Sequence, residues 1–386
     1  MMIWKDEWWG RFRGPQRFIE ESLTVLQNRG VVLLDVPEDL CWRHAFRLTL
    51  WEKLGQWHGS SVSLEELDVR EDCPEVSTEL DAGYAVLNAL SRLRNTHYHM
   101  GRSSAAEYLN QKGPELFQDC VLWVKGFHTP EACSAFSKLC GHCKQGRVRI
   151  ILEDSTGFCK SMANLKRVRY LDYVSSFDTQ LLCMMVVNEI YSDLPLLWRE
   201  YLTVLSAQLC GLDAELAAIL LEQHDLSKEP VLAALMDVAE SGALPQRGAK
   251  PDHILYHLRQ DSDGGRSCTA RLEWKAQLQI GLPILERGLK YAIDQLRNEI
   301  DTLLASETIM QFNEQVSDRN SLETGTLWYL VNTGKLQVND KSVSKLITFL
   351  RNNRNILAHY DLCSLDTMGQ VFDLGRTLGS DGILLA

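Results

Sequence analysis

The chain of 386 residues lacks an excess of positive charge, because 51 Asp and Glu outnumber 40 Lys and Arg and leave a formal net charge of −11. When the chain is divided at residue 250, neither part is basic. Non-specific binding to duplex nucleic acid needs a broad basic surface that neutralises phosphates. The composition therefore argues against this activity and restricts any nucleic-acid contact to a local site.

Long hydrophobic runs are also missing. The densest apolar run, residues 181–187, is far too short to span a bilayer, so we expect no membrane contact. The N-terminus, MMIWKDE, is charged and predicts no secretory signal. Eleven cysteines, an odd number spread along the chain, are typical of reduced and mostly buried thiols. Together these features predict a cytoplasmic protein.

The length and the apolar content of 45% are sufficient for two or three domains with full cores. Residues 241–252 contain two glycines and two prolines and form the clearest linker of the chain. We predict an α/β domain at residues 1–195, a helical lid with this linker at 196–250, and an all-α helical bundle at 251–386.

In the first part, short continuous apolar runs are typical of strands buried on both faces of a sheet. Such strands are expected at residues 31–34, 120–124, 147–152 and 168–173. Helical patterns separate them, which favours a parallel sheet with helical cover. Residues 60–79 are acidic, and we expect them to be irregular and solvated.

The order helix, strand, loop and helix over residues 15–54 resembles the opening of a P-loop NTPase of the AAA+ or STAND type. A phosphate loop needs G-x-x-x-x-G-K-[ST], but residues 35–40 read DVPEDL and contain no glycine and no lysine. In this family an acid serving Mg²⁺ ends the second strand, where this chain has Lys125. We interpret the region as a degenerate, P-loop-like pseudo-NTPase and expect no cofactor. The alternative is a buried strand unrelated to nucleotide-binding folds.

The string Cys140-Gly141-His142-Cys143 resembles the active site of protein disulfide isomerases, but here a helix precedes it and a strand follows. A second interpretation is a zinc site, and its ligands would be Cys133, Cys140 and Cys143 with Cys159 or His128. A lone CxxC pair is most often an ordinary turn with incidental thiols, which is the interpretation that we favour.

In the last part, helices are expected at 254–259, 268–304, 325–332 and 343–360, with a flexible turn at 261–265. The final helix has an apolar stripe, made of Leu346, Phe349, Leu350, Ile356, Leu357 and Tyr360. Arg351, Asn355 and His359 are spaced by four and share another face, beside Arg354. Two arginines, an asparagine and a histidine are suited to holding a phosphate.

The spacing Arg354-Asn355-x-x-x-His359 resembles the R-x4-6-H signature of the HEPN superfamily, and the resemblance covers residues 251–365. It implies a metal-independent endoribonuclease that yields 2′,3′-cyclic phosphate and 5′-hydroxyl ends. In that role His359 transfers protons, Arg354 stabilises charge on the phosphate, Asn355 orients the imidazole or the RNA, and Arg351 adds a phosphate contact.

The resemblance also implies partners: RNA, a second copy of the chain in an isologous homodimer through the helical bundle, and a separate regulatory or antitoxin protein. It suits an effector of antiviral defence or a toxin system, with the pseudo-NTPase part as its sensor. The alternative is a non-catalytic HEPN dimerisation or scaffold subunit. In that case Arg354 and His359 merely cap a helix C-terminus, where the helix dipole favours cations.

Overall fold

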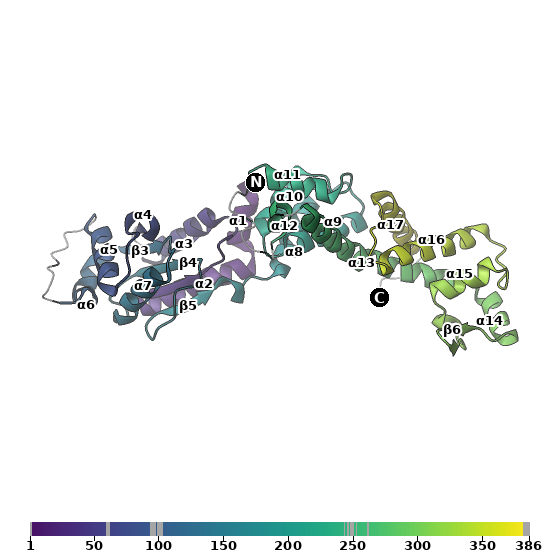
Figure 1. Ribbon diagram of the computed structural model, residues 1–386, viewed down its shortest axis with the longest axis horizontal. Helices are drawn as coiled ribbons and strands as arrows, with labels where there is room; N and C mark the ends of the chain where they lie inside the picture. The colour runs from purple at the N-terminus through teal and green to yellow at the C-terminus, as the bar shows by residue number, and fades with distance from the viewer. Residues whose placement is uncertain are drawn as a thin grey trace. The chain divides into compact units, whose positions relative to one another are not determined.

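The computed structural model describes residues 2–58, 62–92, 98, 103–242, 244, 247, 251, 253–260 and 262–380. The chain forms two compact units, Met1–Thr179 and Gln180–Ala386 (Figure 1). Most of the predicted linker at 241–252, including residue 250, where the predicted lid ends, lies outside the described residues.

The first unit is built on a five-stranded, all-parallel sheet with the strand order β2-β3-β4-β1-β5. Its strands are β1 Val31–Asp35, β2 Ser63–Asp68, β3 Cys120–Lys125, β4 Ile150–Asp154 and β5 Lys166–Arg169. The predicted α/β class with a parallel sheet is thus confirmed. The pairing of Asp35 with Asp154 and of Asp68 with Lys125 places the carboxyl ends of these four strands at one edge.

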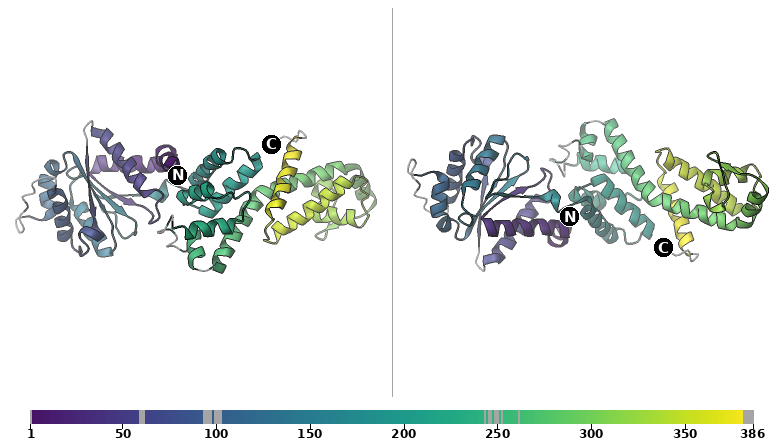
Figure 2. Two further views of the ribbon diagram at one scale, coloured as in Figure 1. Left: turned by 90° about the horizontal axis from the view of Figure 1, so that it is seen from above. Right: turned by 90° about the horizontal axis from the view of Figure 1, so that it is seen from below.

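Helices cover both faces of this sheet (Figure 2). The unit contains α1 Met2–Arg11, α2 Arg13–Arg29, α3 Arg43–His58, α4 Val69–Asp72, α5 Glu79–Ser91, α6 Ala105–Leu116, α7 Pro130–His142 and the 3₁₀ turn Tyr170–Asp172. Alternate strand residues such as Leu122 and Leu152 pack with α5, α6 and α7. The opposite face meets α1, α2 and α3 through aromatic side chains, for example Trp123 edge-on to Phe46 at 5.8 Å.

Two expectations for this unit are wrong in detail. Residues 63–68, expected to be irregular, form β2, and its carboxylates Glu65 and Glu66 are accommodated because an edge strand stays partly exposed. The strands expected at 147–152 and 168–173 begin at Ile150 and Lys166, a shift of two or three residues.

The second unit is helical, as predicted for the C-terminal part. It contains α8 Ser176–Ile190, α9 Leu196–Cys210, α10 Ala214–Gln223, α11 Val231–Glu240, α12 Ile254–Gln260, α13 Ser262–Gln295, α14 Arg297–Ser306, α15 Thr324–Asn332, α16 Lys341–Ala358 and α17 Leu365–Ser380. A small hairpin, β6 Met310–Gln311 and β7 Glu314–Gln315, and the 3₁₀ turn Arg319–Ser321 follow α14. Helix α8 begins four residues before the division between the units.

Helix α13 is the element on which the second unit is assembled, because α9, α12, α16 and α17 all pack against it. The turn expected at 261–265 is wrong, since α13 already begins at Ser262. The last predicted helix ends at Ala358 rather than at residue 360. Helix α17, which the sequence did not predict, covers α9 and α13.

One buried carboxylate ties the first unit together. Glu153 on β4 has a 1% exposed side chain and accepts two hydrogen bonds from Arg47 at 2.9 Å each. The Trp123 indole donates to it at 2.9 Å, and Arg43 completes the set. Burial favours a raised pKa of Glu153, but the hydrogen bonds and charges of the two arginines outweigh it and lower the pKa. Strands β3 and β4 and helix α3 are thereby joined.

We expect Glu153→Gln to lower the free energy of unfolding by about 3–5 kcal/mol at pH 7, because two partly buried arginines lose their counter-charge. The pKa of Glu153 in the folded protein lies below its value of about 4.3 in the unfolded chain. The ionised carboxylate therefore stabilises the folded state above about pH 4.3, and this stabilisation is lost as the pH falls through the pKa of the folded state. Urea unfolding of both proteins from pH 7 down to pH 3 should show their difference shrinking below about pH 4.

The control is Glu66→Gln, which removes the partner of Lys125 in a more exposed pair. Exposed pairs contribute little, so we expect a change below about 1 kcal/mol. Equal losses in the two variants would contradict a structural role for the buried cluster.

Candidate functional site

Helix α16 contains Arg351, Arg354 and Asn355 of the predicted site, and His359 is its C-cap residue. It begins at the N-cap Asp340, whose carboxylate accepts from the Ser342 amide at 2.7 Å. Its buried stripe packs against α13 and α15 and consists of Val343, Ile347, Leu350 and Leu357. Gly288 of α13 leaves space for Leu350, whose methyl carbon would lie 2.8 Å from a Cβ at that position. The close approach fixes α16 on α13.

The end of α16 is a Schellman motif. The amide of His359, the C-cap residue, donates to the Asn355 carbonyl at 3.0 Å, and the Asp361 amide donates back to Ile356 at 3.1 Å. Tyr360 lies between them with φ of +63°, a conformation that usually requires glycine. His359 thus stands just outside the helix rather than within it.

The two arginines are held by neighbouring elements of the same unit. The Arg351 guanidinium lies 3.8 Å from the ring centre of Trp328 on α15, a cation–π contact. The Nε of Arg354 lies 3.3 Å from Glu286 on α13, and its Nη1 lies 3.6 Å from Glu323, the N-cap residue of α15. Both positive charges are therefore directed toward α13 and α15.

Asn355 and His359 lie on the exposed side of the same helix end. Within the described ranges, neither side chain forms a hydrogen bond or an ion pair with another residue. Helical spacing puts the two one turn apart. A solvent-accessible imidazole beside an amide can transfer protons to and from a bound phosphodiester, and this is the chemistry that the site offers.

Two features of the site were not evident in the sequence. Tyr360, expected in the apolar stripe, is 75% exposed and stacks on Trp274 of α13, with ring centres 4.5 Å apart and planes 35° apart. Glu286 and Glu323, which flank Arg354, carry no sequence signal, because they come from separate helices. Only the packing of α13, α15 and α16 brings these groups together.

The carboxyl edge of the sheet, where a nucleotide would bind, is occupied by protein ion pairs. Asp35 at the end of β1 pairs with Arg169 at 3.2 Å and Arg167 at 3.7 Å. Arg43 donates to the carbonyls of Pro37 and Glu38 at 2.8 Å each and so fixes the loop after β1. These contacts give the Asp35 carboxylate and the loop after β1 partners within the protein.

The cysteines give a different grouping from the one expected for zinc. Cys133, Asp154 and Cys159 place their ligand atoms within 4.8 Å of one another, and all three are buried. Cys140 and Cys143 are buried too, but they are not part of this group, and burial raises the pKa of Cys143 to about 12.

Asp154 already has structural partners. Its carboxylate accepts hydrogen bonds from the amides of Thr156, Gly157 and Cys159 and from the Thr156 hydroxyl, at 2.6–3.1 Å. The pKa of Cys159 is raised, first by its hydrogen bond to Cys133 and then by burial. The hydrogen bonds to the Asp154 carboxylate form a turn that closes β4.

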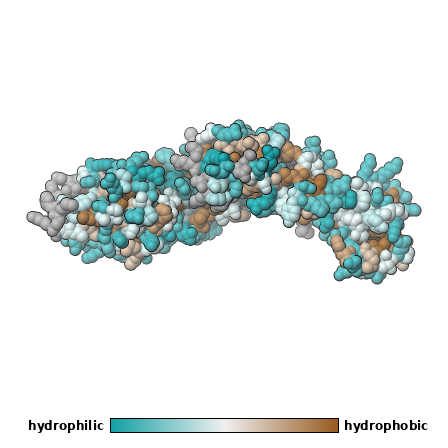
Figure 3. Space-filling view, in the orientation of Figure 1, coloured by the Kyte–Doolittle hydropathy of each residue, from teal (hydrophilic) through white to brown (hydrophobic). Residues whose placement is uncertain are grey.

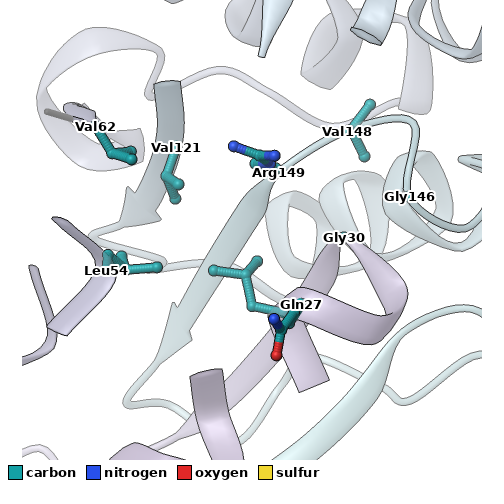
Figure 4. A pocket seen from close by; sticks show the side chains of 9 residues that line it. Gln27, Gly30, Leu54, Val62, Val121, Gly146, Val148 and Arg149 are labelled. Atoms are coloured by element: carbon teal, nitrogen blue, oxygen red, sulfur yellow. The ribbon is translucent and has the colours of Figure 1, made fainter. Parts of the chain in front are cut away.

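A cavity of about 100 Å³ lies at the opposite, amino-terminal edge of the sheet (Figure 4). It is lined by Leu26, Gln27, Gly30, Leu54, Val62, Val121, Gly146, Val148 and Arg149. Ligand sites of enzymes usually enclose ~300 Å³ or more, so this cavity is too small for a nucleotide.

No helix among the described residues combines the length and the apolar character needed to cross a bilayer. On the face drawn in Figure 3, hydrophilic residues predominate and hydrophobic areas are small.

We expect 1 mM ATP or ADP, with or without Mg²⁺, to leave the melting temperature of the protein unchanged within about 1 °C. A ligand at 100 times its Kd would stabilise the folded state by about 2.7 kcal/mol and raise the melting temperature by several degrees. Differential scanning fluorimetry checks this. A rise in melting temperature that saturates with nucleotide concentration would contradict the prediction that the first unit binds no nucleotide.

Comparison with models of protein families gives no match to this sequence. Comparison with curated proteins gives no relative either. The functional argument therefore rests on the side chains at the end of α16.

Proposed function

We propose that the protein is a metal-independent endoribonuclease of the HEPN type, with its active site at the C-terminal end of α16. The observation that carries the proposal is the exposed pair Asn355 and His359 next to two arginines that neighbouring helices hold in place. The HEPN resemblance of Arg354 and His359 supports the same assignment.

The proposed reaction uses the nucleophile that RNA itself carries. The 2′-oxygen attacks the adjacent phosphorus, and the bond from phosphorus to the 5′-oxygen breaks. The 2′-hydroxyl loses its proton and the 5′-oxygen gains one, which gives a 2′,3′-cyclic phosphate and a 5′-hydroxyl. His359 transfers these protons, Arg354 stabilises the charge on the phosphate, Asn355 orients the imidazole, and Arg351 adds a phosphate contact.

One chain supplies one such set of residues. An isologous homodimer through the helical bundle would bring two sets together, so that one imidazole accepts a proton while the other donates. The first unit would then serve as a pseudo-NTPase sensor that restrains or recruits the ribonuclease, alone or with a separate regulatory or antitoxin protein. This arrangement suits an effector of antiviral defence or a toxin system.

A second candidate function is a non-catalytic dimerisation or scaffold module. It is favoured by the two carboxylates next to Arg354, because Glu286 and Glu323 already neutralise the charge that a phosphate would need. In the enzyme, the substrate has to compete with these carboxylates.

We expect the purified protein to cleave mixed single-stranded RNA in the presence of EDTA, and His359→Ala to reduce the rate about 10²- to 10⁴-fold, because proton transfer is lost. Gel assays and detection of 2′,3′-cyclic phosphate ends measure this. His142→Ala, at an exposed histidine of α7, is the control and should keep full activity. Cleavage that survives His359→Ala, or that requires added Mg²⁺, would contradict the proposal.

The double variant Glu286→Gln/Glu323→Gln tests, within the proposed enzyme, whether the two carboxylates compete with RNA for Arg354. If Arg354 binds the phosphate, removing its competitors should raise kcat/KM about two- to fivefold, the range expected for partly exposed ion pairs. Glu307→Gln, which breaks the exposed pair with Lys335, should leave kcat/KM unchanged. A fall in kcat/KM of the double variant would mean that the carboxylates position Arg354 for catalysis rather than compete with RNA.

A further inference from the structure

Tyr360 is held in a costly backbone conformation while most of its ring faces solvent. Its φ of +63° belongs to the left-handed region, which is unfavourable for a bulky residue and is normally filled by glycine at this position of a Schellman motif. The side chain is nevertheless 75% exposed. An exposed aromatic ring in such a place is not explained by burial in a core.

Trp274 keeps this ring in position. The indole Nε1 donates to the Leu357 carbonyl at 2.8 Å, which fixes the orientation of the indole at the end of α16. Tyr360 then stacks on the indole at 4.5 Å between ring centres. One face of the Tyr360 ring thus contacts Trp274, while most of the side chain remains exposed to solvent.

Tyr360 directly follows His359 in the chain, so the Cα atoms of the two residues are about 3.8 Å apart. Single-stranded RNA is commonly recognised by stacking its unpaired bases on aromatic side chains. Stacking does not depend on positive charge. It would therefore give a protein of net charge −11 a source of RNA affinity that a basic surface does not supply.

We propose that Tyr360 stacks on a base of single-stranded RNA adjacent to the scissile phosphate and thereby positions that phosphate at His359. This inference rests on the proposed ribonuclease function and adds to it a positioning residue that contacts an unpaired base of the RNA. Because every base has a face that stacks, the contact favours unpaired over paired RNA more than one base over another.

The test measures binding of a short RNA that contains 2-aminopurine to His359→Ala protein, in which cleavage is prevented. Stacking on Tyr360 should quench the 2-aminopurine fluorescence. Tyr360→Gly, which fits the backbone conformation, should abolish the quenching and weaken binding about 5- to 150-fold, since stacking contributes about 1–3 kcal/mol per base. Tyr360→Phe should restore both. The factor by which Tyr360→Gly weakens RNA binding should be similar at 50 and 200 mM salt, because stacking releases no counterions.

A matched control is Phe312→Gly. Phe312 is also exposed, at 79%, and also has a positive φ, in the turn of the β6–β7 hairpin. This variant should bind the RNA as well as the parent protein does. Equal losses at Phe312 and Tyr360, or unchanged quenching in Tyr360→Gly, would overturn the inference. The inference would also be overturned if the main change in Tyr360→Gly were a shift in sedimentation, because Tyr360 would then contact a second copy of the chain.

The two proposals fail in different ways. If wild type cleaves RNA while Tyr360→Gly keeps both its affinity and its kcat/KM, the stacking role is wrong and the ribonuclease stands. If the RNA binds with quenching but wild type never cleaves it, the ribonuclease is wrong and the stacking site stands. Absence of RNA binding would reject both.

Discussion

The hydrogen bond from the Trp274 indole to the Leu357 carbonyl is the contact on which the C-terminal end of α16, the proposed active site, depends. The last carbonyls of a helix have no partner within the helix, so they need donors from elsewhere. Here α13 provides one, and the return of the chain at Asp361 provides another. Gln277 of α13 then holds the backbone of Cys363 through two hydrogen bonds, at 2.8 and 2.9 Å. As a result, the segment that carries His359 is fixed on both sides.

The polar residues of the site lie in two different environments. Arg351 is placed over an aromatic ring and Arg354 between two carboxylates, whereas Asn355 and His359 remain open to solvent. A guanidinium held by neighbours loses less conformational freedom when it meets a phosphate. The arrangement therefore combines immobilised positive charge with an accessible proton carrier, which the proposed reaction requires.

Two arginines in the first unit are also paired with a carboxylate, but this carboxylate is buried. Arg43 and Arg47 are bound to Glu153 at the sheet edge where a P-loop protein would place its phosphates. Their charge is consumed inside the protein and stabilises the junction of α3, β3 and β4.

The sequence by itself determined the buried strands, because runs such as residues 120–124 are apolar on both faces. Of the apolar stripe predicted for α16, only Leu350 and Leu357 are buried, and Val343 and Ile347 are buried in place of the others. The sequence did not reveal β2, where Glu65 and Glu66 mask an edge strand, nor α17. It brought Arg351, Asn355 and His359 to one helix face by periodicity alone. Only the tertiary structure decided that Tyr360 is exposed and stacked on Trp274, and that Glu286 and Glu323 flank Arg354. These contacts join residues up to 86 positions apart, between Tyr360 and Trp274, and depend on how separate helices pack, which no local pattern encodes.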